Sequence, residues 1–450
     1  MSLSPIPAPP PAPLPADLRI DPQWIIPVEP ARQVLEGHAL IIRGRHILDI
    51  LPIHEADERY QAAEHQRLPG HALIPGLINL HAHAAMSLLR GYADDRPLME
   101  WLQGHIWPAE KRWVTPDFVH DGTQLACLEM LKGGITCFND MYFFPEASLQ
   151  AATQAGQRIA SGLIVLEFPS AWAADPDAYL QQGLAVRDQW LDNPLVHFCL
   201  APHAPYSVSD RSFEKLATYS AQLDLPIHIH LHETLDEITQ SLEHYRQRPL
   251  ERLHRLGLLG PQLIAVHAVH LNPDEQALLA EHSASIAHCP SSNLKLASGI
   301  TPLTSLLTLG LTVGLGTDGA ASNNRLDLWK EMHLAALLAK GISGQADTVP
   351  AHQALAMATI HGARALGLDS RIGSLTIGKE ADLVAVDLSG PETQPCFDPI
   401  SQLVYSAGRA QVSAVWIAGR AVVREHRVLT LDSDAILART HYWRERLQGH

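Results

Sequence analysis

The chain has 450 residues, of which 46% are hydrophobic, and it carries a formal net charge of −15. Its length is enough for about two or three domains, or for one large barrel with an accessory domain. The acidic balance and the absence of a Lys/Arg-rich run argue against nucleic acid or an anionic membrane surface as the main partner. No apolar stretch approaches the roughly 20 residues that span a bilayer, so we expect a soluble protein.

The first residues, MSLSPIPAPPPAPLPADLRI, have neither a basic start nor an apolar core, so they are not typical of a signal peptide. Their prolines favour an extended arm, which we predict over residues 1–16 without a catalytic role. The five cysteines lie far apart and form no C-x-x-C motif, which favours free thiols in a reducing compartment. We therefore expect a cytoplasmic protein.

Residues 17–70 and 373–430 both have the pattern of short antiparallel strands joined by turns. The connections IRGRHI and IAGRAV are similar tight turns, one from each end of the chain. We predict that the two segments form one small β-sandwich domain, with a second domain inserted between them. Residues 431–450 are predicted to form a C-terminal helix.

Residues 71–372 alternate short apolar runs with longer amphipathic stretches. The runs are HALIPGLINLHAH, GITCFNDM, QRIASGLIVL, VHFCLAPHAPYS, PIHIHLHE, LIAVHAVHL, ASIAHCPSSN and TVGLGTDGA. Eight such runs predict a parallel (β/α)8 barrel of the TIM type, and their near-continuous apolarity suits strands covered on both faces. Seven of the runs close in polar residues, at the strand ends where barrel enzymes place their chemistry.

The first and last runs carry a candidate metal site. His81 and His83 in NLHAHAAM are two residues apart, so both rings point to one side of a strand and can share one divalent cation. Asp318 in GLGTDGAASNN ends the eighth run, and the first and eighth strands of a barrel are neighbours. We expect Asp318 beside the histidine pair, although an Asx-turn or a helix N-cap is the alternative for this residue.

The fifth run, PIHIHLHE, places histidines at alternate positions 228, 230 and 232, with Glu233 directly after them. Alternate residues of a strand share a face. The pattern alone leaves open whether all three histidines bind a metal, whether only one does, or whether they form a polar core.

Seven stretches resemble the amidohydrolase superfamily. They are PGLINLHAHAAM, WLQGHIWPAE, APHAPYSVS, HIHLHET, AVHAVHL, CPSSNLKLASG and GTDGAASNN. More narrowly, they resemble the methylthioadenosine/S-adenosylhomocysteine deaminase family and its chlorohydrolase and aminohydrolase relatives. The stretches follow one another in order over almost the whole predicted barrel, so the resemblance is specific.

The resemblance implies one divalent metal ion per subunit, Zn²⁺ or alternatively Fe²⁺. Its ligands would be His81, His83, His230 and Asp318. In the family a glutamate follows the fifth-strand ligand by three residues, which fits His230 with Glu233. His228 is then expected in the barrel core with its nitrogens hydrogen-bonded, and His232 in the loop beyond the strand. The family's bridging lysine of the fourth strand has no counterpart, so a single metal is implied.

The same resemblance implies the catalytic roles. Glu233 would protonate a ring nitrogen and carry the proton to the departing amine. His267 would orient the attacking water, although a core position is the alternative reading and His270 competes for the role. Asp318 would accept the proton that the water loses.

Substrate contacts are also implied by the resemblance. Trp101 would stack on a nucleoside, Glu110 would accept hydrogen bonds from both ribose hydroxyls, and His203 would contact the purine. From the sequence alone, Glu110 could equally open a helix. Ser322 is a further candidate substrate contact. The family also holds a homocysteine carboxylate with arginines; Arg158 is present, but no second arginine aligns, which favours uncharged 5′-thioethers or adenosine.

These features predict a mononuclear metal-dependent deaminase that converts an adenine nucleoside to its inosine analogue and ammonia. The nucleoside would be 5′-methylthioadenosine, S-adenosylhomocysteine or adenosine. The alternatives are a deaminase of guanine or another N-heterocycle, a triazine chlorohydrolase and, more remotely, a non-catalytic metal-binding scaffold. We also expect a homo-oligomer, either a dimer or a tetramer.

Overall fold

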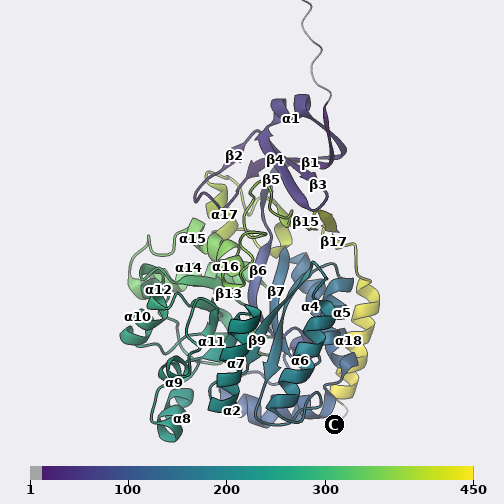
Figure 1. Cartoon of the computed structure of the whole chain (residues 1–450). Helices are drawn as coiled ribbons and strands as arrows, with labels where there is room; N and C mark the ends of the chain where they lie inside the picture. The colour runs from purple at the N-terminus through teal and green to yellow at the C-terminus, as the bar shows by residue number, and fades with distance from the viewer. Residues whose placement is uncertain (1–12, 449–450) are drawn as a thin grey trace, which may run out of the picture.

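Eight parallel strands form the centre of the computed structural model, which describes residues 13–448 (Figure 1). They are β6 (Leu77–Ala82), β7 (Ile135–Tyr142), β8 (Arg158–Val165), β9 (Val196–Pro202), β10 (Ile227–Leu231), β11 (Leu263–His267), β12 (Ser285–His288) and β13 (Thr312–Leu315). Each strand pairs with the next in sequence. The amide of Asp318, just beyond β13, donates to the carbonyl of His81 in β6 at 3.0 Å, so the two ends of the sheet meet. The predicted (β/α)8 barrel is confirmed.

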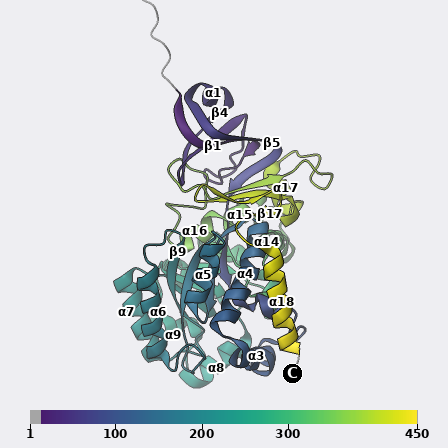
Figure 2. The ribbon, with the colours of Figure 1, turned by 90° about the vertical axis from the view of Figure 1, so that its right-hand side faces the viewer.

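Helices alternate with these strands and cover the outer face of the barrel (Figures 1 and 2). Those along the first half of the barrel are α4 (Pro116–Lys132), α5 (Pro145–Gln154), α6 (Pro176–Trp190), α7 (Asp210–Leu223), α8 (Leu235–Tyr245) and α9 (Pro249–Arg255). Those along the second half are α10 (Pro273–Glu281), α11 (Pro290–Lys295), α12 (Leu303–Thr308), α13 (Ala320–Asn323), α14 (Leu328–Ser343), α15 (Ala351–Met357) and α16 (Ile360–Ala365). Local sequence fixes several of their starts: the Thr115 side chain caps α4, and Asn272 with Glu275 forms a capping box at α10.

Strands from both ends of the chain form one separate sheet at one end of the barrel (Figures 1 and 2). The strands are β1 (Leu14–Ile25), β2 (Leu35–Glu36), β3 (His38–Arg43), β4 (His46–Pro52), β5 (Tyr60–Pro75), β14 (Leu383–Asp387), β15 (Val412–Ile417), β16 (Arg420–Arg424) and β17 (Arg427–Val428). Leu18 and Ile20 of β1 share a hydrophobic core with Leu383 and Trp416 of the C-terminal strands. The sheet therefore ties the two chain ends together.

Three short elements accompany this sheet: α1 (Ile53–Arg59), α17 (Pro399–Tyr405) and η3 (Arg409–Gln411). Two features differ from the sequence-based expectation. The strands β1 and β5 pair in parallel, not antiparallel. The sheet also extends to Pro75 and the barrel begins at Leu77. The boundary between the terminal sheet and the barrel therefore falls about five residues later than expected. Of the predicted N-terminal arm, residues 1–12 lie outside the described part of the chain, and Leu14–Ala16 already belong to β1.

The chain then returns to the barrel as α18 (Ser433–Gln448), which runs beside α4 (Figure 2). The indole Nε1 of Trp443 donates to Asp121 of α4 at 2.8 Å. Near this helix lie the segments that follow β6, namely η1 (Ala84–Leu89), α2 (Leu98–Trp101), the π-helical η2 (Leu102–Ile106) and α3 (Trp107–Trp113). Within the described residues, no helix is long and apolar enough to cross a membrane.

Candidate active site

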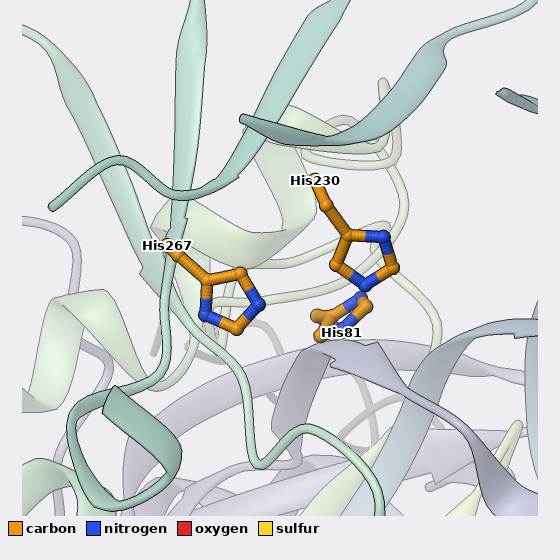
Figure 3. Close-up of side chains that lie close together, drawn as sticks. All are labelled: His81, His230 and His267. Atoms are coloured by element: carbon orange, nitrogen blue, oxygen red, sulfur yellow. The ribbon is translucent and has the colours of Figure 1, made fainter. Parts of the chain in front are cut away.

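Five side chains from four strand ends converge on one point at the C-terminal end of the barrel. The Oδ1 atom of Asp318 lies 3.2 Å from Nε2 of both His81 and His83. The Nε2 atom of His83 lies 3.3 Å from Nε2 of His230. The rings of His81, His230 and His267 come from three different strands and lie around a common space (Figure 3). The structure therefore brings together all the ligands predicted from the sequence.

Hydrogen bonds on the far side of the rings orient them for metal binding. The Nδ1 atom of His83 lies 2.7 Å from the carbonyl of Met141, and Nδ1 of His230 lies 2.7 Å from the carbonyl of His203. A carbonyl only accepts, so each Nδ1 carries a proton, and in the neutral ring each Nε2 offers its lone pair to a metal ion. Three imidazole nitrogens and one carboxylate oxygen form a donor set that suits Zn²⁺. The residues therefore fit a divalent metal ion.

The backbone is strained where it presents two of these groups. His267 has φ 68° and Asp318 has φ 60°, both in the left-handed region that side chains other than glycine rarely adopt. Such conformations persist at functional sites because the surrounding structure enforces them. Here the turn at the strand end directs each side chain into the centre of the barrel mouth.

Charges at the centre favour an ionised Asp318 beside a protonated His83. Burial acts to lower the pKa of His83, but its hydrogen bond with Asp318 outweighs burial and raises that pKa to about 9. Burial acts to raise the pKa of the Asp318 carboxyl, but hydrogen bonds from His81 and His83 outweigh it and hold that pKa well below its usual range. Burial and the neighbouring histidines lower the pKa of His230 well below its usual value. Metal ligands must be a carboxylate and neutral imidazoles, so a bound divalent ion would take the place of the proton on His83.

Two serines hold the second oxygen of Asp318. Ser292 Oγ donates to Asp318 Oδ2 at 2.6 Å, and Ser322 Oγ donates to the same atom at 2.7 Å. Ser322 is buried and is not among the residues that line the active-site cavity, so it orients the Asp318 side chain, whereas the sequence suggested a substrate contact. Ser292 was not predicted at all; its one sequence signal is its position just after the seventh strand.

Glu233 faces this centre from the end of β10. Its Oε2 lies 3.8 Å from Nε2 of His267, whose Nδ1 is 2.8 Å from the side-chain oxygen of Asn293. Burial raises the pKa of Glu233, which favours its protonated form. The Glu237 carboxylate accepts the backbone N–H groups of Glu233 and His232, each at 2.9 Å. The sequence carried a signal for Glu237, since Thr234 and Glu237 have capping-box spacing.

The other histidines of the fifth run lie apart from the centre. His228 is fully buried beneath His81, with its Nε2 3.0 Å from Nδ1 of His81, but its own Nδ1 has no hydrogen-bond partner, which differs from the expectation that both nitrogens are bonded. His232 follows β10 and accepts the backbone N–H of Leu250 at 3.1 Å. His270, which competed with His267 in the sequence, bonds instead to the carbonyl of Ser298 at 2.7 Å.

A cavity of about 550 Å³ opens above the centre. Its walls include Trp101, Glu110 and His203, the three predicted substrate contacts, together with Glu233. Glu110 accepts a hydrogen bond from the hydroxyl of Tyr142 at 2.8 Å, a contact that the sequence did not indicate. Loss of water around its carboxyl raises the pKa of Glu110 to about 7, against the opposing effect of Tyr142.

Arg158 is far from this cavity, which corrects its reading as a carboxylate-binding residue. It is the first residue of β8 and fully buried at the opposite end of the barrel. Its guanidinium donates to Asp382 at 3.1 Å and to Glu380 at 2.9 Å. It therefore joins the barrel to the terminal sheet and cannot reach a substrate.

A barrel whose strand ends direct three imidazoles and a carboxylate at one point, beside a buried glutamate, defines a metal-dependent barrel hydrolase. The chain matches the model of the Amidohydrolase family over residues 72–422, and it belongs to that family.

Several relatives resemble the chain over nearly its full length. A 5-methylthioadenosine/S-adenosylhomocysteine deaminase from Teredinibacter turnerae is 46% identical over 431 residues, which cover 96% of this chain and 98% of the relative. Among solved structures, an adenosine deaminase from Xanthomonas campestris with bound zinc has a TM-score of 0.96 and 46% identity, covering 98% of this chain and 100% of the other. Atrazine chlorohydrolase from Arthrobacter aurescens, complexed with zinc, has a TM-score of 0.88 and 26% identity, covering 95% and 99%.

Proposed function

We propose that the protein is a hydrolytic deaminase that converts an adenine nucleoside to its inosine analogue and ammonia, using one Zn²⁺ ion per subunit. The observation that carries the proposal is a cluster of four candidate ligands at one cavity, which His83, His230 and Asp318 line together with Glu233 and Glu110. The names of the deaminase relatives and the bound zinc of the solved adenosine deaminase support it.

His81, His83, His230 and Asp318 would hold the ion. The bound ion supplies a Lewis acid that makes water acidic enough to attack at neutral pH. His267 is also close enough to be a donor, since its ring shares the space between His81 and His230. We assign His267 to the orientation of the attacking water because its Nε2 lies between that space and the Glu233 carboxylate.

Glu233 carries the proton transfers. In its protonated form it donates to the purine ring nitrogen next to the amino-bearing carbon, so that attack by water gives a neutral tetrahedral intermediate. Asp318 takes the proton that the attacking water loses. The ionised Glu233 takes the proton of the new hydroxyl group and passes it to the amino group, so that the carbon–nitrogen bond breaks, the ring carbonyl forms and ammonia leaves. The proton held by Asp318 then returns to Glu233, which restores both groups. The raised pKa of Glu233 suits the first of these steps.

Glu110 distinguishes a nucleoside from a free base. A carboxylate can accept two hydrogen bonds from a vicinal diol, which a ribose has and guanine or a triazine lacks. Trp101, which is buried in the same wall, offers a flat surface on which the nucleoside can stack. His203 shares the wall and is positioned by its Nδ1 contact with Ser207 at 2.9 Å.

The test is Glu233→Gln, assayed for ammonia release from 5′-methylthioadenosine, S-adenosylhomocysteine, adenosine and guanine. We expect the wild-type protein to act on the nucleosides, and the variant to keep its metal content while kcat falls by ~10²–10⁴-fold, because general acid–base catalysis contributes about that much. Glu251→Gln, at an exposed position of α9, is the matched control.

Near-wild-type turnover by Glu233→Gln would show that another group moves the proton. A metal-loaded wild-type protein without turnover would instead favour the non-catalytic scaffold. The homo-oligomeric state and the cytoplasmic location stay predictions; size-exclusion chromatography with light scattering tests the first.

A further inference from the structure

Three buried residues form a closed triangle of hydrogen bonds behind the active site. The Nδ1 atom of His267 lies 2.8 Å from Oδ1 of Asn293, a residue of α11. The Nδ2 atom of Asn293 donates to Oγ1 of Thr301 at 3.2 Å, and the Thr301 hydroxyl donates to the backbone carbonyl of His267 at 2.8 Å. All three side chains are buried, so water does not compete for these hydrogen bonds.

The triangle allows only one arrangement of its hydrogen atoms. A backbone carbonyl only accepts, so the single hydrogen of the Thr301 hydroxyl is directed at the carbonyl of His267. Towards Asn293 the hydroxyl can then only accept, which places the amide nitrogen of Asn293 at Thr301 and the amide oxygen at His267. Because that oxygen accepts, Nδ1 of His267 must donate. In the neutral ring, Nδ1 therefore carries the proton and Nε2 carries a lone pair.

The Nε2 atom of His267 faces the reaction centre. The His267 ring lies around a common space with the rings of His81 and His230 (Figure 3). Its Nε2 lies 3.8 Å from Oε2 of Glu233. The other two residues of the triangle are not among those that line the active-site cavity, so they act on the centre through His267. The triangle also holds the backbone carbonyl of His267, whose φ of 68° is strained.

We propose that Asn293 and Thr301 are positioning residues that hold His267 as the Nδ1–H tautomer, so that its Nε2 accepts a hydrogen bond from the attacking water. The inference rests on the proposed function, in which His267 orients that water and Asp318 takes the proton that it loses. With one hydrogen directed at His267 and the other at Asp318, the water turns its oxygen towards the purine carbon. The opposite tautomer would direct an N–H at the water and compete for the lone pair that attacks.

Thr301→Val and Thr301→Ser form a matched pair for the test. Valine has nearly the shape of threonine but lacks the hydroxyl, so the Asn293 amide can turn over and His267 can change its tautomer. We expect kcat for 5′-methylthioadenosine to fall ~10-fold or more, since the wrong histidine tautomer costs up to ~10⁴-fold in a catalytic triad. The KM and the zinc content should stay at their wild-type values. Thr301→Ser keeps the hydroxyl and should retain the wild-type kcat.

Thr359→Val is the control for the loss of a buried hydroxyl. The Thr359 hydroxyl also donates to a backbone carbonyl, that of Leu355 at 2.7 Å. Its neighbour Ala358 bonds to Ile78 near the start of β6, so this position lies at the opposite end of the barrel from the active site. We expect wild-type kcat and KM in this variant.

The tautomer itself is measured by NMR of the imidazole nitrogens in zinc-loaded full-length protein with isotope-labelled histidine. The signals of His267 are identified by their absence from His267→Gln. We expect a protonated Nδ1 and a bare Nε2 in the wild-type protein and in Thr301→Ser, and a mixture of tautomers in Thr301→Val. This measurement does not depend on turnover, and the wild-type protein alone provides it if Thr301→Val does not fold.

A proton on Nε2 of the neutral His267 ring in the wild-type protein would overturn the inference. So would a Thr301→Val variant with mixed tautomers and an unchanged kcat, or equal losses of kcat in Thr301→Val and Thr359→Val. These results would leave the deaminase proposal intact. A wild-type protein with the expected tautomer but without nucleoside turnover would overturn the proposed function, and with it the role of the tautomer in the reaction.

Discussion

Glu110 is a carboxylate with one close donor, the Tyr142 hydroxyl, and a pKa raised to about 7 by loss of water. Below that pH the group is neutral, and one of its oxygens becomes a donor, so it is a weaker acceptor for two ribose hydroxyls; above it, both carboxylate oxygens accept strongly. The other charged or titratable groups near this pair include His83, Lys111, Asp140 and Tyr179. The KM for nucleosides should therefore fall as the pH rises through about 7.

Tyr142→Phe tests this relation. The hydroxyl favours the ionised form of Glu110, so its loss should raise the pKa of Glu110 and shift the fall in KM upward by on the order of one pH unit. Glu110→Gln should remove this pH dependence and raise KM. The measurement is KM for 5′-methylthioadenosine between about pH 5.5 and 8.5. Tyr206→Phe, which changes another tyrosine of the cavity, is the control. An unshifted profile in Tyr142→Phe would show that the hydroxyl does not set the charge of Glu110.

Residues predicted from spacing and residues found only in the structure differ in kind. His81 with His83, and His230 with Glu233, are close neighbours in sequence at the ends of single strands, so a motif of fixed spacing can identify them. The contacts of Tyr142 with Glu110 and of Ser292 with Asp318 join different elements, so they depend on tertiary packing. For the same reason the sequence could identify Ser322, which is near Asp318, as part of the site but could not show that its hydroxyl bonds to the Asp318 carboxylate.

At the scale of elements, the barrel strands could be predicted because each is a buried apolar run between polar ends. The parallel pairing of β1 with β5 could not be predicted, because about 45 residues separate Leu14 from its partner Tyr60. No local signal in the sequence sets the relative direction of the two strands. The C-terminal helix was also predicted, but its partner was not. Trp443 and Leu447 of α18 lie in the same hydrophobic cluster as Trp101 and Ala109.

This packing predicts that α18 supports the substrate-binding helices. Trp443→Ala removes a 4% exposed ring that meets Phe118 edge-on at 5.1 Å and donates to Asp121 at 2.8 Å. We expect a loss of about 3–5 kcal/mol in the free energy of unfolding, typical of such truncations. We also expect a severalfold higher KM for nucleosides at unchanged metal content. Urea unfolding and steady-state kinetics measure both, with Tyr442→Ala, at a 40% exposed neighbour, as control. Lower stability with an unchanged KM would limit the helix to a structural role.

At the scale of the whole molecule, a buried ion cluster joins the barrel to the terminal sheet. Arg158 is fully buried at the start of β8, while Asp382 and Glu380 precede β14. Arg371 also donates to Glu380, at 2.9 Å. Burial acts to raise the pKa of Glu380, but Arg158 and the other arginines outweigh it and lower that pKa to about 2. A depressed carboxyl pKa stabilises the fold above the ordinary value near 4.5, and this contribution is lost as the pH falls towards about 2.

Arg158→Met should therefore destabilise the protein without disabling the site. Removing one partner of a buried ion pair leaves uncompensated charge, so we expect a loss of about 3–5 kcal/mol at pH 7. The deficit should shrink as the pH falls from about 5 to about 3, because the wild-type protein then loses the same contribution as Glu380 is protonated. Arg424→Met breaks an exposed pair with Glu64 in the same sheet and should cost at most about 1 kcal/mol.

Urea unfolding of metal-loaded protein across this pH range measures the deficit. The kcat/KM ratio between S-adenosylhomocysteine and 5′-methylthioadenosine should stay at the wild-type value in Arg158→Met, since the cluster lies at the N-terminal ends of the strands and the substrate at their C-terminal ends. A selective loss of S-adenosylhomocysteine turnover would return Arg158 to the substrate site. A deficit no larger than that of Arg424→Met would mean that the hydrophobic contacts between barrel and sheet hold them together without the ion cluster.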